Sequence, residues 1–404
     1  MQRRRHLIWA FSALSAALAA GYGVLFTIVG DIRDEYGLTD TAVGLIVGVG
    51  FLSAFVSQLT IAPVADRGRA RQVVVAGVLV NVLGLLMMGF GTSLTPILTG
   101  RIVSGIGIGA ALPAIRRIVI LAAPDDLGRN LGRLLSADVF GFAMGPAVSA
   151  ILVGPFGLAA PFVVVSAATG LLVVAVFLVE VTETVDPSPS KLALDLLGDR
   201  AVAGAVVLGA GAFLMIGGFD ALWDVVHEDL DTPTWMANLG ITLFALPLII
   251  LGPTGGALAQ RVGPYRMAAL GLILGAGFMT TYGLVPTGTW IFGVSLFHAV
   301  SDGLTIAAAG VAISIVVPEH RQAGAQGLMG GAQALTAGIT AIAIGATYDA
   351  FGRTAAYSLT AVGMVAMIVG GMALAAPTWR PGPVTGAATP APVEDEQHPE
   401  RPRS

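Results

Sequence analysis

The stretches Ala62-Pro-Val-Ala-Asp-Arg-Gly-Arg-Ala-Arg71 and Gly256-Ala-Leu-Ala-Gln-Arg-Val-Gly-Pro-Tyr-Arg266 are short basic segments, each placed between long apolar runs. Aligning Asp66 with Gln260 places the second segment 194 residues after the first. Near the same offset, Gly157 falls on Gly352, and each follows a phenylalanine. The chain therefore consists of two copies of one pattern.

The composition is that of a membrane protein. Hydrophobic residues make up 55% of the chain and charged residues only 11%, and the mean hydropathy is +0.83. A helix needs about 20 predominantly apolar residues to cross a bilayer. The apolar runs predict twelve spans, near residues 7–29, 41–65, 72–91, 95–121, 132–153, 157–180, 201–221, 234–256, 266–286, 289–316, 323–347 and 354–376. Duplicated halves of this kind are common in secondary transporters, whose site opens alternately to the two sides.

Basic residues are unevenly distributed between the links. With the amino terminus inside, the cytoplasmic segments contain all but three of the 21 lysines and arginines, the exceptions being Arg33, Arg101 and Arg353. This asymmetry follows the positive-inside rule, so we expect a multi-pass protein of the cell membrane with both termini cytoplasmic. We expect an N-terminal half over residues 1–180, a cytoplasmic linker over 181–200, a C-terminal half over 201–376 and a disordered tail over 377–404.

Several functions are excluded or disfavoured by the residues present. The chain has no cysteine, which excludes disulfides and thiolate metal sites. Its net charge is −4 and its basic residues are dispersed, so nothing indicates a nucleic-acid partner. We find no nucleophile–base set, phosphate loop or histidine cluster with metal-ligand spacing. We therefore expect no enzyme, no metal and no cofactor; a membrane sensor is a further alternative, for which no output domain is seen.

The repeated segments resemble those of the major facilitator superfamily. Asp66–Arg71 and its second copy are similar to that family's loop signature between spans two and three and between spans eight and nine. Arg101–Ala111 resembles its fourth-helix motif, and Gly141–Ala150 resembles the fifth-helix motif of its proton-coupled drug exporters. Ala62 and the pair Ser149-Ala150 depart from glycines of the family pattern. The resemblance covers about residues 5 to 376 and implies an all-α membrane protein with two six-helix halves.

The two loops are predicted to form a gate. The resemblance implies that they clamp the halves in the outward-facing state, with Arg116 or Arg117 as the partner of Asp66. A carboxylate beside a helix start is also favoured by the positive end of the helix dipole. For Arg69 and Arg71 a second interpretation is equally good, namely that they only set the orientation of the chain in the membrane. The predicted gating residues are Asp66, Arg67, Arg69, Arg116, Gly256, Arg261 and Gly263.

Gly141, Gly145 and Pro146 lie near the middle of the fifth predicted span. Small residues four apart let helices approach closely, and a proline frees a carbonyl and allows a bend. The resemblance implies that this surface packs between the halves and limits leak. Ordinary close packing is the alternative, because 54 glycines are spread through the chain.

Ionisable residues inside spans are candidates for proton coupling, because charges in a bilayer are costly. His298 and Asp302 are four residues apart, hence on one face of the tenth span, and they align with a segment of the fourth span that begins at Arg101. Near the bilayer centre Asp302 could take up and release one proton per cycle. Alternatively, it stays neutral and only packs the bundle. Asp138, in the fifth span, either relays a proton or pairs with an arginine.

In the resembling family, helices 1, 4, 7 and 10 line the central cavity. Their non-aliphatic residues here, apart from the ionisable ones, include Tyr22, Phe26, Ser104, Met215 and Phe219. Carriers of sugars and peptides need many convergent polar groups, so this lining favours an amphipathic, hydrophobic substrate. The aromatic residues could equally serve packing alone.

These predictions combine into one function. We expect a monomeric secondary active transporter that exports drugs or lipophilic small molecules in exchange for protons. The alternative on the same fold is an importer of a small organic acid or nutrient, because the fold by itself decides neither direction nor cargo.

Overall fold

The structure is a computed structural model that describes residues 2–177, 181 and 192–376. The predicted tail over 377–404 and residues 182–191 of the predicted linker over 181–200 lie outside the described residues. All the elements described are helical. Their bounds are α1 Gln2–Tyr36, α2 Asp40–Thr60, η1 Ala62–Asp66, α3 Ala70–Phe90, α4 Leu94–Ala122, η2 Pro124–Asp126, α5 Leu127–Phe156, α6 Ala159–Phe177, η3 Ala193–Gly198, α7 Arg200–Asp229, α8 Thr234–Val262, α9 Pro264–Leu284, α10 Gly288–Thr305, α11 Ala308–Val316, η4 Glu319–Arg321 and α12 Gln322–Ala375.

Helices are the expected element because lipid offers no hydrogen-bond partner to an open backbone group. Polar caps start some of them: Thr39 accepts a hydrogen bond from the backbone N–H of Ala42 at 3.2 Å, and Asp199 accepts one from Ala201 at 2.7 Å. Gly263 ends α8 with a φ of 112°, and Pro264 starts α9 directly afterwards. A helix can turn tightly into the next one there, because glycine tolerates positive φ and proline suits the first helical position.

The predicted twelve-helix fold is confirmed. Ten helical segments of the described chain are long and apolar enough to cross a membrane. One of them, over residues 319–375, contains non-helical backbone at Gly352 and therefore supplies two spans. The slightly shorter apolar helix α6 brings the described spans to twelve. The tenth span is interrupted near Ile306, where α10 ends and α11 begins two residues later.

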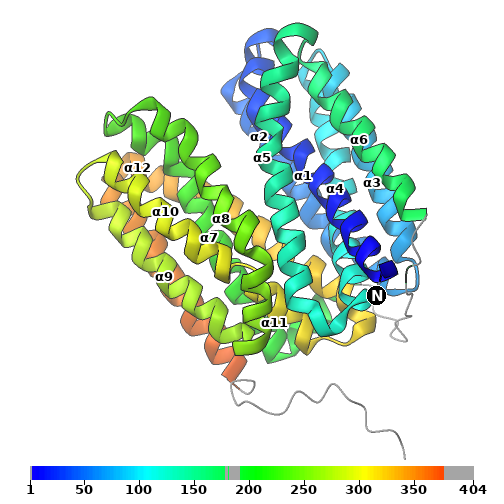
Figure 1. Ribbon diagram of the computed structural model, residues 1–404. Coiled ribbons are helices and arrows are strands. Elements are labelled where there is room, and N and C mark those ends of the chain that lie inside the picture. The colour runs from blue at the N-terminus through cyan, green and yellow to red at the C-terminus, as the bar shows by residue number, and fades with distance from the viewer. Residues whose placement is uncertain (1, 178–180, 182–191, 377–404) are drawn as a thin grey trace, which may run out of the picture.

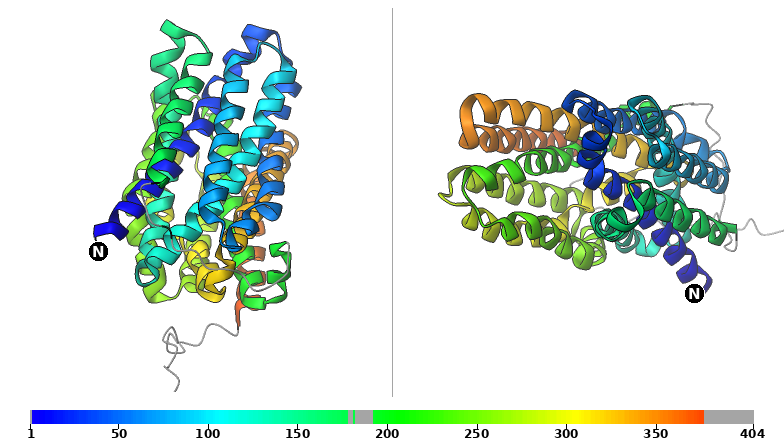
Figure 2. Two further views of the ribbon diagram at one scale, coloured as in Figure 1. Left: turned by 90° about the vertical axis from the view of Figure 1, so that its right-hand side faces the viewer. Right: turned by 90° about the horizontal axis from the view of Figure 1, so that it is seen from above.

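The helices form two bundles that stand side by side (Figures 1 and 2). Helices α1–α6 make one bundle and α7–α12 the other, as Figure 1 shows by colour and label. Each bundle buries its own apolar core: one cluster extends from Ala193 to Ala375, and two others consist almost wholly of residues between Leu7 and Val176. We refer to the bundles below as the N-half and the C-half.

The internal repeat is visible in the backbone. Gly157 has φ 79° and ψ 175°, and Gly352, its counterpart by alignment, has φ 78° and ψ 179°. Gly68 and Gly263, 195 positions apart, also both have positive φ, at 73° and 112°. The two halves therefore make the same turns at the same places.

The described contacts between the halves gather at one end of the molecule, the lower end in Figure 1. This end carries Arg67, Arg69, Arg129 and Arg261, and we call it the basic end. Here α5 and α8 approach until backbones touch, whereas Figure 1 shows them diverging toward the opposite end. A Cβ atom on either Gly128 or Gly132 of α5 would collide with a backbone carbonyl of α8. Small residues thus permit the close approach that joins the halves.

Candidate functional site

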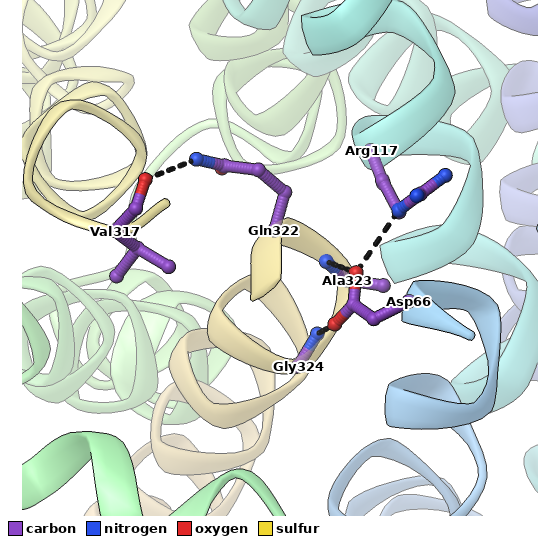
Figure 3. A network of polar contacts seen from close by, with 6 residues as sticks. All are labelled: Asp66, Arg117, Val317, Gln322, Ala323 and Gly324. Atoms are coloured by element: carbon purple, nitrogen blue, oxygen red, sulfur yellow. Dashed lines mark hydrogen bonds and ion pairs between the residues drawn. The ribbon is translucent and has the colours of Figure 1, made fainter. Parts of the chain in front are cut away.

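Asp66 connects the two halves at the basic end (Figure 3). The short helix η1 presents it, 1% exposed, to the first turn of α12. Its Oδ1 accepts a hydrogen bond from the backbone N–H of Ala323 at 2.9 Å, and its Oδ2 accepts one from Gly324 at 2.7 Å. These N–H groups have no partner within their own helix, and the positive end of the helix dipole favours an anion. A carboxylate of the N-half thereby caps a helix of the C-half.

Arg117 completes this cap. Its Nε donates to Asp66 Oδ1 at 2.9 Å, and both side chains are almost fully buried. Of the two arginines predicted as partners, Arg116 does not make this contact: its Nη2 lies 3.5 Å from Asp138 Oδ2 instead. Consecutive helix residues point about 100° apart, so only one of the pair can face η1. The partner of Asp66 is therefore Arg117 and not Arg116, and a gating role for Arg116 stays a prediction.

Gln260 makes the equivalent connection from the C-half. Its Oε1 accepts a hydrogen bond from the backbone N–H of Gly128, in the first turn of α5, at 2.7 Å. Its Nε2 donates to the carbonyl of Asp125 at 3.3 Å. Gln260 was not among the predicted gating residues, although its alignment with Asp66 was the signal that could have identified it.

The other predicted gating residues surround these two caps. Gly256 packs against the backbone of Gly128, and Gly263 makes the turn after α8. Arg67, Arg69 and Arg261 are exposed. The glycines therefore shape the contact between the halves, while these arginines place positive charge at its rim.

The fifth-helix glycines do not pack between the halves in this conformation. A Cβ atom on Gly141 would collide with the carbonyl of Ala16, and one on Gly145 would collide with Gly23, so both contact α1 of their own half. Pro146 is exposed. Contact with the C-half comes from Gly128 and Gly132 instead. The reason is rotational: Gly141 follows Gly128 by thirteen residues, which places it about 220° round the helix.

His298 and Asp302 form a buried pair on α10, within the C-half. His298 Nε2 lies 3.4 Å from Asp302 Oδ2, and the two side chains are at most 3% exposed. His298 Nδ1 makes a 3.0 Å hydrogen bond with the hydroxyl of Tyr282, and Nε2 lies 3.2 Å from the sulfur of Met215. Phe278 stacks on the imidazole. A histidine and an aspartic acid therefore share an apolar, aromatic site.

A small cavity adjoins Asp302. Its volume is about 20 Å³, and its lining includes Met215, Gly271 and Thr305. A cavity of roughly this size holds one water molecule. Asp302 therefore has space beside it for a proton carrier, although it is shielded from bulk solvent.

Arg101 is enclosed within the N-half. Its guanidinium carbon lies 4.3 Å from the centre of the Tyr22 ring and 5.9 Å from that of Phe51. Its Nε donates to the carbonyl of Ile46 at 3.3 Å, while Nη2 is buried without a hydrogen-bond partner among the described residues. A Cβ atom on Gly50 would collide with this side chain. Cation–π contact stabilises the charge in part, and one donor remains available.

Asp138 is paired, as the second of its two interpretations predicted. Besides Arg116, it accepts a hydrogen bond from the hydroxyl of Ser15 on α1. The four ionisable candidates therefore occupy three separate sites. Arg101 and Asp138 each lie at a site of their own in the N-half, and His298 and Asp302 share one in the C-half.

The predicted cavity residues are not all exposed to the space between the halves. Phe26 is 36% exposed and contacts Phe142 of α5. Ser104 accepts a 2.9 Å hydrogen bond from Asn81 of α3 and is buried, as are Met215 and Phe219 in the core around His298. In this conformation each of these three faces the inside of its own half, because hydropathy cannot tell which way a helix is rotated. Their role in a substrate cavity stays a prediction.

Comparison with known proteins supports a transporter. An MFS-type transporter of Methanocaldococcus jannaschii is 22% identical over 328 residues, which cover 76% of this chain and 82% of that protein. Multidrug resistance protein 2 of Bacillus subtilis is 26% identical over 153 residues, which cover 36% of this chain and 37% of that protein. Other matched relatives are named as glucose and niacin transporters, so the relatives do not select a substrate.

The same architecture occurs in solved structures. The human organic anion transporter MFSD10 (TETRAN) superposes with a TM-score of 0.79 at 13% identity, covering 91% of this chain and 99% of that one. At this identity the likeness shows the fold alone. The family model for the Major Facilitator Superfamily matches residues 11–237 and 207–403, which together span both halves. The chain therefore belongs to the Major Facilitator Superfamily of membrane transporters.

Proposed function

We propose that this chain is a monomeric, proton-coupled transporter of the cell membrane that exports lipophilic small molecules by alternating access. The observation that carries the proposal is the buried Asp302. Among the described residues, no arginine or lysine nitrogen lies within 4 Å of its carboxylate, and the titratable side chains that act on it are His298 and Asp220. An isolated carboxylate is costly in a membrane, so Asp302 is stable when it is protonated or when His298 carries the proton. Loss of that proton would favour a conformation that hydrates the pair.

The arrangement of the halves supports an outward-facing state. By the positive-inside rule, the basic end faces the cytoplasm. At this end Asp66 and Gln260 bridge the halves, while the opposite ends of α5 and α8 diverge (Figure 1). In this orientation the cytoplasmic side is closed. Rocking of the halves would break these bridges and expose the substrate site to the cytoplasm.

A cluster of aromatic residues in the N-half supports a lipophilic substrate. Phe26, which is partly exposed, lies 6.0 Å from Phe142 and 6.1 Å from Phe51, measured between ring centres. Such rings bind apolar and aromatic compounds by area and by ring contacts, with little need for polar groups. The multidrug relative is consistent with this substrate class.

The proposal can be tested with the purified protein in liposomes that contain a pH-sensitive dye. Lipophilic cations are added outside, and we expect them to induce a proton flux. Asp302→Asn, which keeps the shape of the side chain but cannot lose a proton, should abolish that flux. Asp31→Asn, which changes an exposed carboxylate, should retain it. A flux that persists in Asp302→Asn would refute the coupling role.

Arg101 supports one alternative, the import of a small organic acid. Its Nη2 is buried without a hydrogen-bond partner among the described residues, and an arginine can hold a carboxylate through paired hydrogen bonds. In the same liposomes, uptake of an aromatic carboxylate that is lost in Arg101→Gln, without any flux induced by cations, would favour this alternative over the exporter.

A further inference from the structure

Three arginines surround a groove between the halves at the basic end. Arg129 and Arg133 of α5 and Arg261 of α8 line a cavity of about 360 Å³. The remaining lining residues are Pro253, Thr254, Ala257 and Leu258 of α8. The groove therefore combines a cluster of guanidinium groups with a mostly apolar wall.

The positive charge of this groove is not neutralised by the described part of the protein. No described carboxylate forms an ion pair with any of the three arginines. Within the part of the chain that the structure describes, these side chains make one hydrogen bond, from Arg133 Nη1 to the amide oxygen of Asn130 at 2.8 Å. Three like charges around one cavity repel one another, so a bound anion would stabilise them.

The groove opens on the surface that faces lipid. Phe140 follows Arg133 by about two helical turns on the same face of α5 and is 49% exposed. Ile250 precedes Arg261 by about three turns on the same face of α8 and is 69% exposed. Exposed apolar side chains in line with the arginines are typical of a bilayer-facing surface. The arginines thus lie where the hydrocarbon region meets the headgroups.

We propose that this groove binds the headgroup phosphate of an acidic phospholipid from the cytoplasmic leaflet. The planar guanidinium fork suits phosphate oxygens, and basic pockets between membrane helices bind acidic headgroups. An acyl chain would lie along Leu258 and Ile250. The proposal rests on the membrane orientation given above and is independent of substrate and of proton coupling.

The position of the groove gives the lipid a structural effect. Its walls come from α5 of the N-half and α8 of the C-half, which touch directly beside it through Gly128 and Gly256. A phosphate that contacts both walls would be released when the halves separate at this end. The lipid would therefore stabilise the conformation that is closed at the basic end.

The experiment is native mass spectrometry of the full chain in detergent, titrated with phosphatidylglycerol or with phosphatidylcholine of the same acyl chains. We expect phosphatidylglycerol to bind at least tenfold more tightly. The triple variant Arg129→Gln, Arg133→Gln and Arg261→Gln should lose that preference. A matched variant, Arg4→Gln, Arg5→Gln and Arg200→Gln, removes the same charge from exposed positions elsewhere and should keep it.

A second variant separates the groove from the charge alone. Thr254→Trp fills the groove at an exposed position without changing any charge, and we expect it to weaken phosphatidylglycerol binding as well. Equal loss in the matched triple variant would mean general surface attraction and would overturn the proposal. Displacement of the lipid by an equal concentration of inorganic phosphate would indicate a site for a soluble anion, and would also overturn it.

Discussion

Asp66 and Gln260 occupy equivalent positions in the two halves, and each accepts a hydrogen bond from the first turn of a helix in the opposite half. Asp66 accepts from Gly324 of α12 at 2.7 Å, and Gln260 accepts from Gly128 of α5 at 2.7 Å. The two contacts close the basic end from both sides. The two side chains differ in charge. Asp66 is a carboxylate that also forms an ion pair with Arg117, whereas the amide of Gln260 is neutral. The closed end is thus held by one strong and one weak connection.

This difference predicts a graded response to substitution. Asp66→Ala would break a buried ion pair with Arg117 and remove the acceptor of two backbone N–H groups of α12, whereas Gln260→Ala removes neutral hydrogen bonds worth about 1 kcal/mol each. We expect the first variant to open the basic end in most molecules and the second to open it in fewer.

Spin labels measure this opening directly, because the chain has no cysteine of its own. Labels at the exposed positions Gln72 and Glu319 report on the distance across the basic end. Glu35→Ala, at the exposed end of α1, is the control and should not change the distance distribution. A distribution that is the same in Asp66→Ala as in the unmodified protein would contradict the gating role.

Gly132→Ala should disrupt the contact between α5 and α8. The added methyl group would collide with the carbonyl of Gly252, a backbone atom that cannot move aside without separating the helices. We expect substrate-dependent transport to fall at least tenfold. Gly154→Ala is the matched control on the same helix, because no atom lies within 4 Å of its added methyl group. Similar transport rates in the two variants would mean that this close approach is not required.

Gly157→Ala and Gly352→Ala should each destabilise the fold by a similar amount. Both residues have φ near 80° with extended ψ, a region that is almost restricted to glycine and costs other residues about 1–3 kcal/mol. Neither methyl group would meet another atom within 4 Å, so the backbone alone decides the result. The measurement is the thermal unfolding midpoint in detergent, with Gly170→Ala as the control in a helix. A midpoint unchanged in both variants would refute the shared turn geometry.

Asp138→Asn should leave proton-coupled transport largely intact, in contrast to Asp302→Asn. Asp138 is partly accessible, and it contacts Arg116 and the hydroxyl of Ser15. Its negative charge is therefore already balanced by Arg116. Proton flux in liposomes decides between the two carboxylates. Loss of flux in Asp138→Asn, with normal folding and substrate binding, would assign the relay to α5 instead of α10.

Much of the architecture was predictable because it depends on local properties of the chain. Runs of about 20 apolar residues identify spans, and arginines at alternate links indicate their orientation. The alignment of Asp66 with Gln260 revealed the duplication, and the structure repeats it in the backbone of Gly157 and Gly352. The number of helices therefore followed from hydropathy, and the duplication followed from the alignment of the two halves.

The partners of individual side chains depended on how each helix is rotated and tilted against its neighbours. Arg116 and Arg117 are adjacent in sequence, yet only Arg117 reaches Asp66. Met215 aligns with no special motif, yet it contacts His298 inside the C-half. Which side chains meet depends on close packing between helices that are far apart in the sequence, and no local sequence pattern contains this information. Hydropathy, arginine placement and the repeat were sufficient to predict a duplicated bundle of membrane helices, whereas tertiary packing alone decided which charges meet, because only packing sets the rotation of each helix.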